Sequence, residues 1–170
     1  MTNICSLNVS EGCTIEAKAY SANNFAEAKY GYLKLNGNTV WQASFIGDYP
    51  NMYGANIFVV DMSTCTLVES RNYNTYADAT AASRLRGFIQ GLSDGTVLVG
   101  VSGDEASIYL GEAEATLAGL GADVSDVGYR GAWAFAAEIG DPSKTVLDKE
   151  LTEASAMARQ PIITTSLEGT

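Results

Sequence analysis

The chain has 170 residues, of which 46% are hydrophobic and 18% charged, and it carries a net charge of −10 with no histidine. This length and composition predict a single globular domain over residues 1–170, and no apolar run approaches the roughly 20 residues that a membrane-spanning helix needs. The acidic balance disfavours binding to nucleic acid and attachment to an anionic membrane, and the lack of histidine excludes a Ser-His-Asp triad, a Cys-His pair and an HExxH zinc site.

The first half of the chain predicts strands. Alternation of apolar and polar residues over Thr14–Tyr20 is typical of a half-buried strand. Asn36-Gly37 stands between two apolar-rich runs and predicts a hairpin, because both residues tolerate positive φ. A second antiparallel pair is predicted from Ile57–Val60 and Thr66–Tyr73, which the segment DMSTC joins by a turn.

The middle of the chain predicts two helices around a strand. The first helix begins at Thr75, which stands with Asp78 at the spacing of a capping box, and it buries an apolar face. The segment TVLVGVS after it is a valine-rich strand. A second helix is predicted to begin at Asp104 and to end at Gly121, a residue suited to the position after a helix. The apolar face of the first helix comprises Leu85, Phe88, Ile89 and Leu92.

The last third predicts two more strands. Tyr129–Ile139 alternates Trp133 and Phe135 with small residues, and Pro161–Leu167 supplies a final strand. The segment between them, Gly140–Gln160, is predicted to be a loop with room for a short helix. The order of these elements predicts an α+β fold with mostly antiparallel β-sheet and two or three short helices, and it allows a sandwich of two sheets that face each other.

Three cysteines make an odd count. Cys5, Cys13 and Cys65 allow one disulfide and one leftover thiol in a secreted protein, or three thiols in the cytosol. The sequence leaves open whether Cys13 pairs with Cys5 or with Cys65. The first residues, MTNICSLNVSEGC, lack the apolar region of a secretory signal, so none is predicted in this chain.

Two charged positions at strand ends allow either a structural or a functional interpretation. Asp104 and Glu105 could simply cap a helix, and Arg130 could cover an aromatic ring with its stem. Alternatively, the strand ends meet at one rim, where a carboxylate accepts from hydroxyls, a guanidinium donates in a fork and an aromatic covers a sugar face. Neither GDEAS nor DVSD has EF-hand spacing, so no metal and no cofactor is predicted.

Five short motifs, in order, resemble one family. They are N-x-x-V-V-D, R-x-Y-x-T-Y, L-x-D-G-T-V, D-E-A and G-Y-R-x-x-W-A-F, spread over about residues 53–140. The segment resembles the interleukin-like epithelial–mesenchymal transition inducers, and a similar domain forms the stem of protein O-mannose N-acetylglucosaminyltransferase. The resemblance implies a non-catalytic β-sandwich. It also implies binding of β-linked N-acetylglucosamine through the positions that are Asp104 and Arg130 here.

The leading hypothesis is a secreted lectin for glycans that end in N-acetylglucosamine or N-acetylgalactosamine. Asp104, with Glu105 beside it, accepts hydroxyl protons and Arg130 donates. Because single lectin sites are weak, a homo-oligomer is expected. The apolar wall is expected from Tyr129, Trp133 or Tyr53.

Two other hypotheses compete with the lectin. A secreted cytokine-like factor would bind a protein receptor through the aromatic loop IGDYPNMYGAN. A glycosidase would need two acids about 5–10 Å apart across a cleft. Since Asp104 and Glu105 are sequence neighbours and no other acid is clearly placed to join them, the chain is not predicted to be an enzyme.

Overall fold

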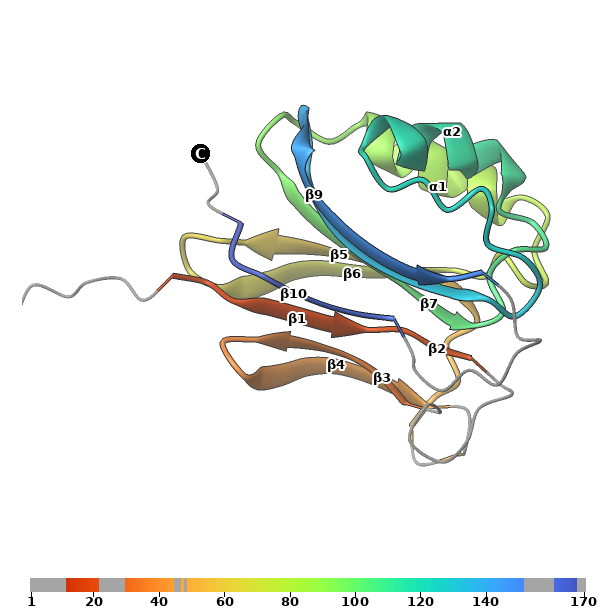
Figure 1. Cartoon of the computed structure of the whole chain (residues 1–170), viewed down its shortest axis with the longest axis horizontal. Helices are drawn as coiled ribbons and strands as arrows, with labels where there is room; N and C mark the ends of the chain where they lie inside the picture. The colour runs from red at the N-terminus through yellow and green to blue at the C-terminus, as the bar shows by residue number, and fades with distance from the viewer. Residues whose placement is uncertain (1–11, 22–29, 45–46, 48, 152–160, 168–170) are drawn as a thin grey trace, which may run out of the picture.

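The computed structural model describes residues 12–21, 30–44, 47, 49–151 and 161–167. These ranges contain ten strands in two mostly antiparallel sheets and two helices, which confirms the predicted α+β sandwich (Figure 1). The elements are β1 (Ile15–Lys18), β2 (Tyr20–Ser21), β3 (Tyr30–Leu35), β4 (Asn38–Ser44), β5 (Gly54–Asp61), β6 (Thr66–Tyr73), α1 (Ala81–Gln90), β7 (Val97–Asp104), α2 (Gly111–Gly119), β8 (Ala132–Glu138), β9 (Asp141–Glu150) and β10 (Ile162–Thr165).

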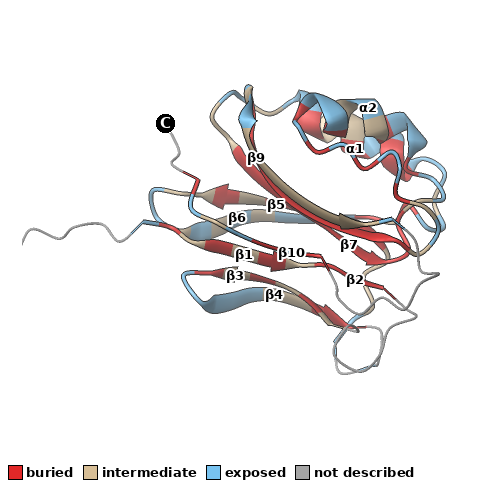
Figure 2. Ribbon diagram, viewed as in Figure 1, coloured by how far each residue is buried: buried red, intermediate tan, exposed pale blue. Residues whose placement is uncertain are grey.

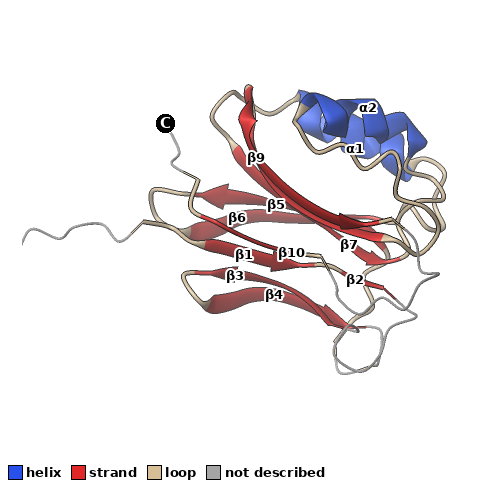
Figure 3. Cartoon of the chain, in the orientation of Figure 1, coloured by secondary structure: helices blue, strands red, loops and turns tan. Residues whose placement is uncertain are grey.

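The molecule has three layers. One sheet has the strand order β10-β1-β3-β4, and the other has the order β6-β5-β7-β8-β9 with the short β2 added in parallel to β7. Both helices lie on one face of the larger sheet, and the smaller sheet lies on the other face (Figure 3). The larger sheet is therefore the middle layer, and β7 and β8 are buried along their whole length (Figure 2).

Alternation in β8 divides its side chains between two cores. Trp133 and Phe135 pack in the core beneath the helices, with ring centroids 5.8 Å apart. Their small neighbours Ala132, Ala134 and Ala136 belong to the core between the two sheets. Small side chains on that face allow the second sheet to pack closely, so the pattern of large and small residues places a layer on each side.

Most of the predicted strands are confirmed. Residues of β1 pair with β3 and with β10, and β3 pairs with β4 across the hairpin turn. At that turn Asn36 has φ 48° and Gly37 has φ 80°, the left-handed pair that a tight two-residue turn requires. The pairing of β5 with β6 is also antiparallel, as predicted for the segments around DMSTC.

The first helix begins later than predicted. It begins at Ala81 rather than at Thr75, and its buried face includes the predicted Leu85 and Ile89. Thr75 is fully buried, and its hydroxyl donates to the carbonyl of Ala106 instead of capping a helix. Asp78 accepts from the backbone and hydroxyl of Thr80, so the proposed capping box does not form.

The prediction of a helix starting at Asp104 is wrong. The strand β7 continues through Asp104, because Gly103 and Asp104 pair with Tyr20 and Ser21 of β2. The helix α2 begins only at Gly111, and the acids in its first turn are Glu112 and Glu114. Helix capping therefore does not account for Asp104. The predicted end is confirmed, since Gly121 follows α2 with φ 87°.

The segment predicted as a loop over residues 140–160 is in part a strand. Residues Asp141–Glu150 form β9, which pairs with β8 at the edge of the larger sheet. Its charges and Pro142 hid the strand in the sequence, although an edge strand tolerates both. Residues 152–160 lie outside the described part of the chain.

A disulfide joins the two sheets. Cys13, just before β1, is bonded to Cys65 in the turn between β5 and β6. The alternative pairing of Cys13 with Cys5 is therefore wrong, and Cys5 lies outside the described residues. The bond fastens the end of the sandwich opposite the end of β7 where Asp104 lies, because Val60 near Cys65 pairs with Val97 at the start of β7.

Candidate functional site

Four chain segments of the larger sheet meet at one of its ends. Antiparallel pairing places the start of β5 beside the ends of β6 and β7, and it places the start of β8 there too (Figure 1). Gly54 pairs with Gly103, for example, and Ala55 pairs with Tyr73. The predicted site residues Tyr53, Asp104 and Arg130 flank these strand ends, so the fold gathers at one rim residues that are far apart in the sequence.

Asp104 and Arg130 converge through Ser21 and Glu105. Ser21 pairs with Asp104 in the β2–β7 ladder, and its hydroxyl donates to the Arg130 carbonyl at 3.0 Å. The backbone N–H of Arg130 donates to the Glu105 carboxylate at 3.4 Å. The two predicted ligand-binding positions therefore lie at the same rim of the sheet.

Both residues have an unusual backbone conformation. Asp104 has φ 54° and Arg130 has φ 55°, and the only other described non-glycine residues with positive φ are Asn36 and Cys65, each in a turn. A non-glycine residue in the left-handed region costs about 1 kcal/mol or more, and such residues cluster at functional sites. Arginine has no short polar side chain to ease this conformation, so its presence at this position calls for a reason beyond the turn itself.

A chain of hydrogen bonds fixes the Asp104 carboxylate. The backbone N–H of Met52 donates to the Tyr20 hydroxyl at 2.7 Å, and this hydroxyl donates to the side-chain oxygen Oδ1 of Asn51, also at 2.7 Å. The side-chain nitrogen Nδ2 of Asn51 in turn donates to Oδ2 of Asp104 at 2.8 Å. The loop can cross the end of β7 because Gly103 has no side chain, since a Cβ there would lie 2.0 Å from the Met52 carbonyl oxygen. Asp104 is consequently buried beneath this loop and only 3% exposed.

Tyrosines surround this polar centre. Partial desolvation, the charge of Asp104 and a hydrogen bond with the Asp104 side chain raise the pKa of the Tyr53 hydroxyl, so these two groups interact. Tyr53 stacks on Tyr76 with ring centroids 5.0 Å apart. On the other flank, the guanidinium carbon of Arg130 lies 5.3 Å from the Tyr129 ring centroid. Tyr129 is 51% exposed, so it can offer a ring face to a ligand.

Two predicted site residues have structural surroundings instead. The Glu105 carboxylate accepts from the backbone and hydroxyl of Ser107 and from Arg130, so it ties the loop after β7 to the segment before β8. It is 1% exposed. Trp133 is also 1% exposed and lies in the core beneath the helices. The prediction that Trp133 contributes to a surface wall is wrong, because its position in β8 faces α1 and α2.

Sequence reasoning missed four residues of this centre. Asn51, Tyr20 and Ser21 contact Asp104 or Arg130 directly or through one another, and Tyr76 extends the aromatic surface. The segment YPNMYG offered a signal, because the side-chain amide of Asn51 stands two residues before Tyr53 and close to the start of a predicted strand. Tyr20 and Ser21 gave none, since their importance depends on the parallel pairing of β2 with β7.

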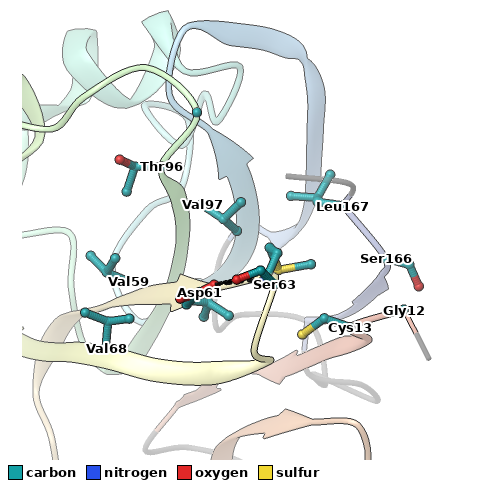
Figure 4. A pocket seen from close by; sticks show the side chains of 13 residues that line it. Gly12, Cys13, Val59, Asp61, Ser63, Val68, Thr96, Val97, Ser166 and Leu167 are labelled. Carbon is teal, nitrogen blue, oxygen red and sulfur yellow. Dashed lines mark hydrogen bonds between the residues drawn. The ribbon is translucent and has the colours of Figure 1, made fainter. Parts of the chain in front are cut away.

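A separate hollow of about 750 Å³ lies at the opposite end of β7, beside the disulfide (Figure 4). Valines from three strands and Leu167 line it together with small hydroxyl residues. Its carboxylate, Asp61, already accepts from Ser63 and Thr64. None of the predicted site residues lines this hollow, and it has no guanidinium, so the rim around Asp104 remains the better candidate.

Neither metal ligation nor a membrane span is evident in the described ranges. Those ranges hold no group of three or more His, Cys, Asp or Glu side chains that could share a metal ion. Within the same ranges, neither helix has the length and apolar character to cross a bilayer.

Comparison with known families agrees with the predicted resemblance. The family model of the interleukin-like EMT inducers matches residues 53–141, just over half of the chain. The chain belongs to the interleukin-like EMT inducer family. A search of the curated proteins gave no match.

The matched segment divides this interleukin-like EMT inducer domain in an informative way. It runs from Tyr53 to the start of β9, so it includes Asp104, Arg130 and both helices. The smaller sheet (β1, β3, β4 and β10) lies outside the match, as do Tyr20, Ser21 and Asn51. The family segment thus provides the charged pair and the Glu105–Arg130 hydrogen bond, and the flanking residues Ser21 and Asn51 provide further hydrogen bonds to the pair.

Proposed function

We propose that this protein is a non-catalytic lectin that binds a terminal N-acetylhexosamine, such as N-acetylglucosamine or N-acetylgalactosamine, at the Asp104–Arg130 rim. The observation that carries the proposal is the convergence of these two residues, both with left-handed backbones, at the one end of the sheet that is ringed by tyrosines.

The chemistry of the rim suits a neutral sugar. An ionised carboxylate only accepts hydrogen bonds, so Asp104, whose Oδ2 accepts from the Asn51 side chain, is suited to accept from ligand hydroxyls as well. The Arg130 guanidinium donates to ring, hydroxyl or acetamido oxygens. Tyr53 and Tyr129 provide the apolar wall expected for the C–H face of the sugar, in place of Trp133.

Catalysis is not part of the proposal. Hydrolysis of a glycosidic bond needs two carboxyl groups that face one another across the bond. Glu105 is hydrogen-bonded to Ser107 and Arg130, so it is held as part of the loop. Asp104 is left as the ligand-facing acid of this rim, and it binds rather than cleaves.

An extracellular location and self-association belong to the same proposal. A disulfide persists in oxidising compartments, and the family is of a secreted type. Shallow sugar sites bind weakly one at a time, so a homo-oligomer would raise the avidity for a glycan surface by presenting several copies.

A cytokine-like factor remains the competing candidate. The description of the family as interleukin-like favours it, and the exposed tyrosines around the rim would suit a protein receptor equally well. The two candidates make different predictions. A receptor-binding factor needs no sugar preference, and it needs no charge at Asp104.

The test is a binding titration of Asp104→Asn against N-acetylglucosamine and N-acetylgalactosamine by calorimetry. The amide can still accept from Asn51 through its oxygen, so the loop stays in place while the negative charge is lost. Charge-assisted hydrogen bonds contribute about 1.5–3 kcal/mol, so the affinity should fall about ten-fold to 150-fold.

Asp61→Asn is the matched control. It makes the same chemical change at the last residue of β5, at the far end of the sheet, and it should leave sugar affinity unchanged. Equal affinity of Asp104→Asn and the starting protein would overturn the site. Failure of the starting protein to bind any amino sugar would favour the receptor-binding candidate.

A further inference from the structure

We propose that the rim binds at least two linked sugar residues, with the second residue lying over the Tyr53–Tyr76 pair. This inference rests on the proposed lectin function, and it adds a ligand class, an oligosaccharide rather than a single sugar. The second position comprises Tyr53, Tyr76, Tyr109 and Ile108, which we call the aromatic strip.

The aromatic strip comes from three loops that lie side by side. Tyr53 and Tyr76 stack with their planes 20° apart. The amide of Tyr109 donates to the Thr75 carbonyl at 2.8 Å, which holds the loop after β7 beside Tyr76. The segments before β5, after β6 and after β7 therefore form it together, as the antiparallel order of these strands requires.

Its side chains are more exposed than a structural role explains. Tyr76 is 36% exposed, Tyr109 is 42% and Ile108 is 47%. Large apolar side chains that gather on one surface mark interaction sites more often than isolated ones do. Among the described residues, the four exposed tyrosines all come from loops at this end of the sheet: Tyr49, Tyr76, Tyr109 and Tyr129.

Tyr53 links the strip to the charged centre. Its hydroxyl lies close to Asp104, and its ring stacks on Tyr76. One face of Tyr76 covers Tyr53, so the exposed part of Tyr76 includes the opposite face. A sugar held at Asp104 would therefore direct its next ring over Tyr76 rather than into solvent.

The strip should recognise the ring face of the second sugar more than its hydroxyl pattern. Its exposed surface is aromatic and aliphatic, and an aromatic ring offers an apolar face rather than a set of hydrogen-bonding partners. We therefore expect a modest gain in affinity that tolerates different second sugars but depends on an aromatic ring at position 76.

The experiment compares the methyl β-glycoside of N-acetylglucosamine with four disaccharides in which the same sugar is β-linked to O2, O3, O4 or O6 of a second hexose. The best disaccharide should bind about five-fold tighter than the monosaccharide. Tyr76→Ala should remove this gain, because it should lower the affinity for the disaccharide about five-fold more than the affinity for the monosaccharide, and Tyr76→Phe should preserve the gain. Tyr32→Ala, on the smaller sheet, is the remote tyrosine control.

Each outcome has a distinct meaning. If the monosaccharide binds and no disaccharide binds more tightly, or if Tyr76→Ala keeps the gain, the second position is wrong and the lectin proposal stands. If no sugar binds, both proposals fail. If Tyr76→Ala lowers monosaccharide and disaccharide affinity equally, Tyr76 belongs to the first sugar position and the inference is overturned.

Discussion

Trp133→Ala should lower the free energy of unfolding by about 3–5 kcal/mol, the usual cost of removing a fully buried large aromatic. The side chain is 1% exposed and packs against Phe135 beneath the two helices. Removing the indole leaves a cavity, because neither helix can move into that space without losing its own contacts. Chemical denaturation of the purified variant measures the loss.

Tyr129→Ala is the matched control, because it removes a neighbouring aromatic that is 51% exposed. It should change the unfolding free energy by no more than about 0.5 kcal/mol. A stable Trp133→Ala variant that loses sugar affinity would contradict the core position of Trp133. It would return this residue to the binding surface.

Removing the disulfide should have a similarly large effect. Cys13 and Cys65 are separated by 52 positions, and closing a loop of that length stabilises the folded chain by about 4 kcal/mol in the chain-entropy description. The double variant Cys13→Ser/Cys65→Ser should therefore unfold at a much lower denaturant concentration than the oxidised protein. Because the bond lies at the far end of the sandwich, the fraction that stays folded should keep its sugar affinity.

Cys5→Ser provides the comparison for this second prediction. It removes a thiol while leaving the bond between Cys13 and Cys65, so its denaturation midpoint should match that of the starting protein. An unchanged midpoint for the double variant would mean that the two sheets hold together without the bond.

Local patterns were sufficient to predict the elements whose side chains alternate or recur regularly. The hairpin at Asn36-Gly37, the buried face of α1 and the alternation in β8 were all predicted from neighbouring residues, and the structure confirms them. The hairpin and α1 each bury one face, and β8 alternates large and small side chains between two buried faces, so the burial pattern is encoded in the sequence. The β-sandwich was also implied by the family resemblance, and the matched family model confirms that resemblance.

The errors arose where a distant contact overrides a local preference. Aspartate is a common helix-capping residue, so a helix was predicted to begin at Asp104. In the structure β2 pairs with Asp104, and strand β7 extends to this residue instead. Thr75 likewise gives its hydroxyl to Ala106, which is remote in sequence. The edge strand β9 lacks a clean alternation because it is half-exposed along most of its length.

The charged pair of the candidate site and the tyrosines Tyr53 and Tyr129 beside it were predictable. Asp104 and Arg130 stood out as charges at predicted strand ends, the family motifs then pointed to the same two positions, and the structure brings them to one rim. Their supporting residues, Asn51 and Tyr20, come from segments that meet Asp104 only after both sheets have assembled. No local rule reports such a contact, because it depends on the packing of one sheet against the other.

The most direct test of the account is the mapping of backbone amide chemical shifts during titration of the ¹⁵N-labelled protein with N-acetylglucosamine. The account predicts saturable shifts that are largest at Tyr53, Asp104 and Arg130 and negligible near Val97. Shifts concentrated around Val97 and Ser166, or none at saturating sugar, would contradict it.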